Sequence, residues 1–334
     1  MPELRHNIAT GDWVIFATER AKRPHDYVKT KKDEQVFPEY KESCPFCLGN
    51  ENKTPGELFR LVDQNKWFVR VVPNLFGALS PNENNHHKVD GIYISMGGYG
   101  SHEVIIENTR HNSCIALMND EEVANIIRVY KARYIRLAQT KGLESIIIFK
   151  NHGLGAGTSL EHPHSQLIAT PLIPPHIKTR IQVAQDYFDK TGDCVFCKMV
   201  EEEQKSGKRM VLENESFSSF LPYAGMTPFL LWICPKRHAS SFDDISDKEI
   251  VDLASILRKT LKKLYYGLSN PDFNFVIRSC PTKDKGGEYL HWYLNIIPRL
   301  TQPAGFELGS GMFINSSLPE ESAEFLRNVN CPGG

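Results

Sequence analysis

Cys44-Pro45-Phe46-Cys47 opens a pattern of two cysteines and two histidines that the chain repeats. His111 and His162 complete the first copy, and the second copy consists of Cys194-Val195-Phe196-Cys197, His238 and His291. The first histidines lie 127 positions apart and the second ones 129. Two thiolates separated by two residues, together with two imidazoles, complete a tetrahedral zinc shell. The near-constant offset predicts a duplicated scaffold with two zinc ions.

Each cysteine pair has two other interpretations, a thioredoxin-like redox pair and two buried thiols. A redox pair is expected at the start of a helix in a βαβ unit, whereas Cys44 follows a charged segment. Zinc is favoured because both pairs have histidines in register. Four protein ligands leave no open position for water or substrate, so both ions are expected to be structural.

The two copies differ at one position. In Glu161-His162-Pro163-His164-Ser165-Gln166 a second histidine follows the predicted ligand His162, whereas Tyr293 stands two residues after His291. Strand alternation places His162 and His164 on one face. Neutral imidazole is a nucleophile that can carry a phosphoryl group. We therefore expect His164 to be the catalytic residue; the alternative is a histidine of the core.

Groups suited to binding phosphate surround His164 in the sequence. Asn151, Ser159 and Gln166 are candidate donors, and the glycines from Gly153 to Gly157 allow the backbone to approach a pyrophosphate. The segment Arg20-Ala21-Lys22-Arg23 supplies cations for phosphates. The alternative for this last segment is an exposed basic turn.

The repeat extends to secondary structure. Each half shows a strand, a helix with capping-box spacing at Asn119 or Ser246, a second strand, and a strand that follows the second histidine. This order predicts an α+β fold with mainly antiparallel sheets flanked by helices. Prolines near residue 175 separate an N-terminal half, 1–175, from a C-terminal half, 176–334, which is structural and substrate-binding. The charged stretch Glu201 to Arg209 is expected to be a solvated loop.

Bulk properties exclude some classes. Among 334 residues the net charge is −1, so no nucleic-acid partner is expected. No apolar run approaches the roughly 20 residues of a membrane span, and the N-terminus lacks the apolar core of a signal peptide. Four of the eight cysteines lie outside the two pairs, scattered along the chain. Such scattered cysteines fit reduced thiols in the cytoplasm.

At these residues the chain resembles the galactose-1-phosphate uridylyltransferases of the histidine-triad superfamily. The motifs cover nearly the whole chain: Trp13-Val14, Arg20 to Pro24, Cys44 to Cys47, Asn74 to Leu79, His111, Asn151, Ser159, His162 to Gln166, and Gly305-Phe306-Glu307. The resemblance implies two fused histidine-triad-like halves, a homodimer and a nucleotidylylated His164. It also implies substrate contacts from Arg20, Arg23, Asn74, Asn151, Ser159, Gln166 and Glu307.

The expected reaction moves a nucleoside monophosphate between a nucleotide sugar and a hexose 1-phosphate, as in UDP-glucose–hexose-1-phosphate uridylyltransferase. Typical members read Asn-Asp where this chain has Asn74-Leu75, which weakens the inference of uridine. The shorter C-terminal segment is similar to a branch with a plant ADP-glucose phosphorylase. Phosphorolysis of ADP-glucose is therefore the alternative reaction, and a zinc-stapled binding protein is the non-enzymatic alternative.

Overall fold

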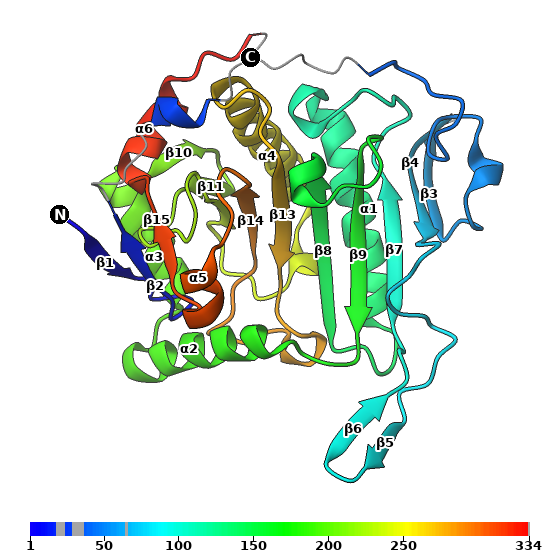
Figure 1. Ribbon diagram of the computed structural model, residues 1–334, viewed down its shortest axis with the longest axis horizontal. Helices are drawn as coiled ribbons and strands as arrows, with labels where there is room; N and C mark the ends of the chain where they lie inside the picture. The colour runs from blue at the N-terminus through cyan, green and yellow to red at the C-terminus, as the bar shows by residue number, and fades with distance from the viewer. Residues whose placement is uncertain (18–23, 29–36, 64–65, 333–334) are drawn as a thin grey trace.

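One long antiparallel sheet forms the centre of the molecule (Figure 1). The computed structural model describes residues 1–17, 24–28, 37–63 and 66–332. Within them, the sheet has ten strands, which are in spatial order β10 (Met210–Glu213), β11 (Phe217–Phe220), β12 (Leu231–Pro235), β14 (Tyr293–Pro298), β13 (Phe273–Arg278), β8 (Ser145–His152), β9 (His164–Thr170), β7 (Ser101–Ile106), β4 (Lys66–Pro73) and β3 (Phe59–Asp63).

The sheet consists of two five-stranded halves with the same topology. Reading outward from the centre, the first half runs β8, β9, β7, β4, β3 and the second runs β13, β14, β12, β11, β10. The halves join where β8 pairs with β13, with Asn151 opposite Asn274. The predicted α+β class and the duplication of one architecture in two halves are therefore confirmed.

Helices α1 (Asp120–Ala138) and α4 (Asp247–Gly267) pack against each other and against one face of the sheet. Both begin with the predicted capping box, in which Asn119 and Glu122, or Ser246 and Glu249, exchange backbone and side-chain hydrogen bonds. Capping satisfies backbone donors that a helix leaves unpaired at its start. The two equivalent helices therefore satisfy the backbone donors of their first turn in the same way.

A single hydrophobic core lies between these two helices and the sheet. Ile127 of α1, Leu257 of α4, Ile148 of β8 and Phe275 of β13 all belong to it and are almost fully buried. Burial of each such side chain contributes about 1.5–3 kcal/mol. One core therefore spans both halves and joins them.

Smaller elements surround the sheet. The strands β1 (Glu3–His6), β2 (Trp13–Phe16) and β15 (Phe313–Asn315) form a separate sheet, and β5 (His87–Asp90) with β6 (Tyr93–Met96) forms a hairpin that projects from the body (Figure 1). The C-terminal segment adds α5 (Gly305–Ser310) and α6 (Pro319–Asn328). In the described ranges, every helix is too short or too polar to cross a bilayer.

Four helices were not expected from the sequence: α5, α6 and two helices near the junction of the halves. Helix α2 (Pro175–Thr191) starts at the prolines that separate the halves, and α3 (Val195–Ser206) follows Cys194. The expectation of a loop from Glu201 to Arg209 is therefore wrong over its first six residues. Charges on the exposed face of α3 masked its buried side, where Phe196, Val200 and Glu203 repeat at helical spacing.

Candidate active site and metal clusters

The first cysteine–histidine cluster contains all four predicted ligands. Cys44, Cys47, His111 and His162 are buried, and one ligand atom from each lies within 4.8 Å of all the others. Sγ of Cys47 lies 3.6 Å from Nδ1 of both histidines. Tetrahedral zinc, with usual bonds to sulfur and nitrogen, holds these atoms about 3.5 Å apart. The cluster can therefore hold a metal ion and its geometry is compatible with zinc.

Neighbouring groups set the ring orientations in this cluster. Nε2 of His162 donates to the carbonyl of Asn108 at 2.7 Å, which turns Nδ1 toward the cysteines. Burial lowers the pKa of His162 to about 4, so the ring is in the neutral form that binds metals. Burial raises the pKa of the Cys44 thiol to about 11. Its thiolate form therefore requires the positive charge of a bound ion.

The second cluster contains three of its four predicted ligands. Cys194, Cys197 and His238 lie together, with 3.4 Å between Sγ of Cys197 and Nδ1 of His238. The ring of His291 is 5.5 Å from that of His238, close to the 5.4 Å of the first cluster. However, Nδ1 of His291 donates to the carbonyl of Trp292, and Nε2 is buried without a partner. The second cluster is thus less regular than the first.

His164 begins β9 and is held in one tautomer. Its Nδ1 donates to the carbonyl of His162 at 2.8 Å, which leaves a lone pair on Nε2. The ring is buried, beside the edge of Phe46 at 5.6 Å between ring centres. Burial lowers the pKa of His164, so the imidazole is neutral. A neutral ring with a free Nε2 is the form that can attack phosphorus.

A buried polar network that the sequence did not predict supports this strand from the helix side. Lys150 donates to the carbonyl of His164 at 3.0 Å and pairs with Glu107 at 2.5 Å. Glu107 also accepts from Ser165 and from Tyr130 of α1. The only signal in the sequence was a lysine that ends the apolar run Ile146 to Phe149. Buried charges require such partners.

Gln166 is oriented by a second residue that sequence reasoning missed, His102. The backbone amide of Ala78 donates to Nδ1 of His102, so Nε2 carries the proton and donates to Oε1 of Gln166 at 2.8 Å. Nδ2 of Asn74 lies 3.4 Å from the same oxygen. With its oxygen fixed in this way, the amide NH2 of Gln166 points away from both neighbours. It is free to donate to a ligand.

The second half of the chain holds the glycine loop of the first half. Oδ1 of Asn151 accepts from Asn274 at 2.7 Å, and the carboxylate of Asp272 accepts from the amide of Gly155 at 2.8 Å. Gly153 has φ of +84°, and a Cβ there would lie 2.0 Å from Asp272. The loop, including η5 (Leu154–Ala156), leads to Ser159, which is exposed. Because a Cβ at Gly153 would collide with Asp272, the close approach of the loop to Asp272 requires glycine.

Of the remaining predicted substrate contacts, only Glu307 belongs to the described residues, and it lies away from His164 (Figure 1). Arg20 and Arg23 lie outside the described residues. Glu307 is on α5, which contacts β15, and its carboxylate accepts from the amide of Ala304 at the start of its own helix. In Figure 1, α5 lies beside the C-terminal half, well away from β9.

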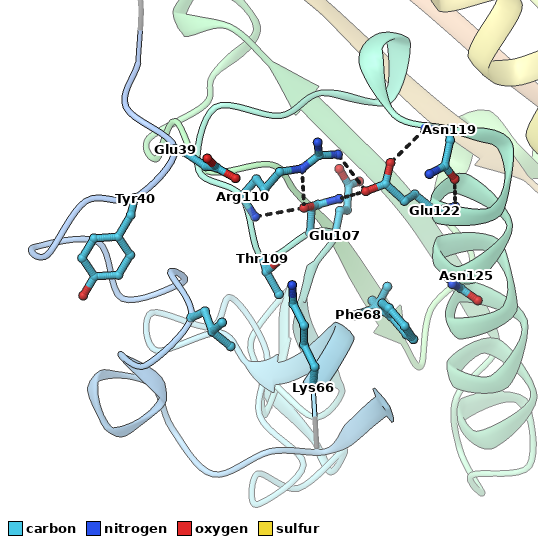
Figure 2. Close-up of a pocket in the computed structure, with 13 residues that line it drawn as sticks. Glu39, Tyr40, Lys66, Phe68, Glu107, Thr109, Arg110, Asn119, Glu122 and Asn125 are labelled. Atoms are coloured by element: carbon cyan, nitrogen blue, oxygen red, sulfur yellow. Dashed lines mark hydrogen bonds and ion pairs between the residues drawn. The ribbon is translucent and has the colours of Figure 1, made fainter. Parts of the chain in front are cut away.

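A cavity near the first cluster does not coincide with the predicted site. It has a volume of about 570 Å³ and lies between α1 and the β3–β4 hairpin. Figure 2 shows Arg110 paired with Glu122 on one wall, with Lys66 and Phe68 opposite. Neither His164 nor any predicted substrate contact lines it. Its mixed charges do not indicate a particular ligand.

Tyr293 occupies in the second half the position that His164 has in the first. Each lies two residues after the second histidine, at the start of β14 or β9. The ring centre of Tyr293 is 4.4 Å from Trp232 and 5.3 Å from Phe196. Phe196 and Phe46 are equivalent, because each stands in the Cys-x-x-Cys motif of its half. An aromatic cluster around Tyr293 thus takes the place of the oriented imidazole of the first half.

Comparison with protein families agrees with this architecture. The model for the N-terminal domain of galactose-1-phosphate uridyl transferase matches residues 1–174. The model for the C-terminal domain of the same family matches residues 180–300. The two models together cover most of the chain.

Individual relatives match over nearly the full length. ADP-glucose phosphorylase of Arabidopsis thaliana is 38% identical, over 98% of this chain and 93% of the relative. A crystal structure of an ADP-glucose phosphorylase from the same plant, with bound ADP-glucose, has a TM-score of 0.85 with 36% identity and covers 99% of both chains. Galactose-1-phosphate uridylyltransferase of Thermotoga maritima is 28% identical, over 98% of this chain and 99% of the relative. The chain therefore belongs to the galactose-1-phosphate uridyl transferase family of nucleotidyltransferases.

Proposed function

We propose that this enzyme transfers a nucleoside monophosphate from a nucleotide sugar to a phosphate acceptor through a covalent intermediate on Nε2 of His164. The observation that carries the proposal is the hydrogen bond from Nδ1 of His164 to the carbonyl of His162. It leaves Nε2 unprotonated and fixes the ring on a strand supported by Lys150. An alternative role as a core histidine does not require an oriented, neutral ring.

Two displacements account for the transfer. Nε2 of His164 attacks the α-phosphorus, the bond from phosphorus to the bridging oxygen breaks, and the sugar 1-phosphate leaves with the electron pair. An oxygen of the acceptor phosphate then attacks the same phosphorus, and the nitrogen–phosphorus bond breaks. The leaving group is a stable anion, so the enzyme's contribution is positioning and charge stabilisation. The NH2 groups of Gln166 and Asn151 and the hydroxyl of Ser159 are the proposed donors to phosphate oxygens.

The favoured nucleotide sugar is ADP-glucose, with inorganic phosphate as acceptor. The relative with 38% identity is an ADP-glucose phosphorylase. In this chain Leu75, 69% exposed, follows Asn74 in the segment expected to contact the nucleoside. A leucine there supplies no hydrogen bond to a uridine. The second candidate is uridylyl transfer between UDP-glucose and a hexose 1-phosphate, which the family models and the Thermotoga relative support.

We propose zinc in both clusters. Cys44, Cys47, His111 and His162 would hold one ion, and Cys194, Cys197, His238 and His291 the other after a turn of the His291 ring. A zinc ion closed by four protein ligands supplies folding stability rather than chemistry. The first ion would fix His162, whose carbonyl sets the tautomer of His164.

We also propose a cytoplasmic homodimer. Glu307 is the expected hexose contact but lies on α5, beside the exposed side chains of Phe306 and Leu308. A second copy of the chain could bring this segment to His164. The cytoplasm is supported by the eight cysteines, all of which are free thiols.

The proposal is tested by trapping the intermediate. Purified protein is incubated with ADP-glucose or UDP-glucose radiolabelled at the α-phosphate and then denatured. We expect retained label that is labile in acid and stable in base, and none with His164→Ala. Release of the label by inorganic phosphate or by hexose 1-phosphates identifies the acceptor. Turnover without retained label in the wild type would refute the covalent scheme. A non-catalytic binding protein would show no turnover and would retain no label.

A further inference from the structure

The second half carries polar residues where the first half has its proposed phosphate-binding residues. The equivalent pairs are Arg278 for Asn151, Tyr293 for His164, and Asn295 for Gln166. Strand register establishes them, because Phe149 pairs with Gln166 in the first half and Val276 with Asn295 in the second. Asn151 and Arg278 each lie two residues beyond these pairs, and His164 and Tyr293 two residues before. Side chains two apart share a face.

The two sets of positions lie at opposite ends of the sheet. Asn151 pairs with Asn274 where β8 meets β13, and Arg278 is four residues further along β13. That spacing corresponds to about 13 Å along a strand. Helix α2 crosses this second end of the sheet in Figure 1. A ligand bound beside Arg278 would therefore not share the space of one bound at His164.

A small cavity is present at these positions. Its volume is about 60 Å³, and it lies between α2 and the ends of β8, β13 and β14. A single water needs roughly 10–15 Å³ of such space, so a group of the size of phosphate can enter. Ile147, Ile177 and Ile181 belong to its apolar walls. The polar side chains that line it are Arg180, Arg278, Ser279, His291 and Tyr293.

The positive charge in this cavity is incompletely balanced. Arg180 donates to the hydroxyl of Tyr293 at 3.4 Å and is 4.0 Å from the carboxylate of Asp12. Arg278 has no carboxylate partner among the described residues; its one contact there is with Nε2 of His176 at 3.2 Å, and its Nε is buried without a partner. Burial lowers the pKa of His176, and Arg278 and Arg180 lower it further, which favours the neutral ring and an Nε2 that accepts from Arg278.

Such a cationic site is costly unless an anion occupies it. Nε of Arg278 is buried without a partner, and such a group loses hydration that nothing in the described residues replaces. Planar guanidinium forks match the oxygens of phosphate. Burial lowers the pKa of Arg278, with a further lowering from Arg180, which agrees with a charge that lacks compensation.

We propose that the cavity between α2 and β13 is a second phosphate-binding site, in which Arg278 and Arg180 hold a phosphate group and Tyr293 prevents its transfer. The phosphate is either inorganic phosphate or the phosphate of a sugar phosphate. Tyr293 stands where the first half has His164, so the site lacks the imidazole that is proposed to react and binds phosphate without reacting. The bound anion would link α2 to the sheet. This inference does not depend on the chemistry of His164.

Equilibrium dialysis with radiolabelled inorganic phosphate, and separately with radiolabelled glucose 1-phosphate, tests the proposal. The full-length Gln166→Ala variant is the background, because it removes a proposed phosphate contact of the first half. We expect about one phosphate per chain to remain in that background. In that background, the additional substitution Arg278→Met should weaken phosphate binding by at least about tenfold. The control substitution Arg258→Met removes an arginine that pairs with Asp120 elsewhere in the fold, and it should leave phosphate binding unchanged. Binding of one ligand alone would identify the source of the phosphate.

Melting temperatures separate a binding role from a structural one. Without phosphate, Arg278→Met should melt at or above the wild type, because it removes an uncompensated charge. A clear fall in melting temperature would show that Arg278 is structural and would contradict the proposal. No phosphate bound in the Gln166→Ala background, or binding there that Arg278→Met leaves unchanged, would also overturn it. Arg278→Lys should weaken binding, because an ammonium group cannot replace the planar fork.

Discussion

The two halves of this molecule share a topology and differ in chemistry. Each has the same order of strands, the same capping box and a cysteine–histidine cluster. At the position of His164 the second half has Tyr293, and at that of Lys150 it has Ile277. The first half thus keeps a buried charge behind a histidine, whereas the second has an apolar residue behind a tyrosine.

Under the proposed mechanism, this difference separates the half that reacts from the half that does not. The backbone is common to both halves, so the backbone alone does not produce a nucleophile. The hydrogen bond that orients His164 and the ion pair that supports its strand occur in one half. Paired substitutions at equivalent positions therefore separate what the fold requires from what the reaction requires.

The largest contrast is expected between His164→Ala and Tyr293→Phe. Loss of a nucleophile lowers kcat by a factor on the order of 10⁴ to 10⁶, whereas Tyr293→Phe should retain most activity. Initial rates with ADP-glucose and phosphate, and with UDP-glucose and hexose 1-phosphates, measure both. A comparable loss in Tyr293→Phe would move the chemistry into the second half.

Substitutions in the two metal clusters should differ less in their effects than His164→Ala and Tyr293→Phe do. Elemental analysis is expected to find two zinc ions per chain, with one lost in Cys47→Ser and one in Cys197→Ser. Because a structural ion contributes its binding free energy to folding, both variants should lose several kcal/mol of stability. The loss should be greater for Cys47→Ser, whose cluster has four buried ligands in range. Well under one zinc per wild-type chain would rule out this assignment.

A smaller loss of stability is predicted for substitution of Lys150 on β8 and of Ile277 at the equivalent position on β13. Lys150→Met should lower the free energy of unfolding by about 3–5 kcal/mol, because it leaves Glu107 buried without its cation. Ile277→Val, at the equivalent position, should cost about 0.5–1.5 kcal/mol. Urea denaturation measures both. Equal costs would mean that Lys150 and Glu107 do not act as a buried pair.

The smallest effects should be equal in the two halves. Asn119→Ala and Ser246→Ala each remove the side-chain acceptor of a capping box and should cost about 1 kcal/mol. Thermal denaturation of the two variants provides the comparison. A cost confined to one helix would show that the halves differ in stability as well as in chemistry.

Local patterns in the sequence were sufficient to predict much of the fold. The spacing of Asn119 and Glu122 gave the start of α1, and apolar runs gave β8 and β13. All four members of the first cysteine–histidine cluster were predicted, because the ligand spacing of a metal site is constrained by coordination geometry. These features depend on residues that are near in sequence or on a chemistry with few solutions.

Features that depend on tertiary contacts were missed. Nothing local in the sequence links His102 to Gln166, which lie 64 positions apart but on paired strands. Glu107 is likewise 43 positions from Lys150. The exposed face of α3 is dense in charge, and this obscured its narrow apolar stripe. The orientation of His291 could not be predicted from the sequence either, because it depends on one hydrogen bond to the carbonyl of Trp292.

The seam between β8 and β13 has a consequence for how the chain can be divided. Separation of the halves would turn two central strands into open edges, with unpaired amides along Ser145–His152 and Phe273–Arg278. Open edges of apolar strands recruit other chains and lead to aggregation. Each half pairs with the exposed edge strand of the other, so neither half is expected to persist as an independent soluble fragment. A cut between the halves would be tolerated only if both fragments were produced together.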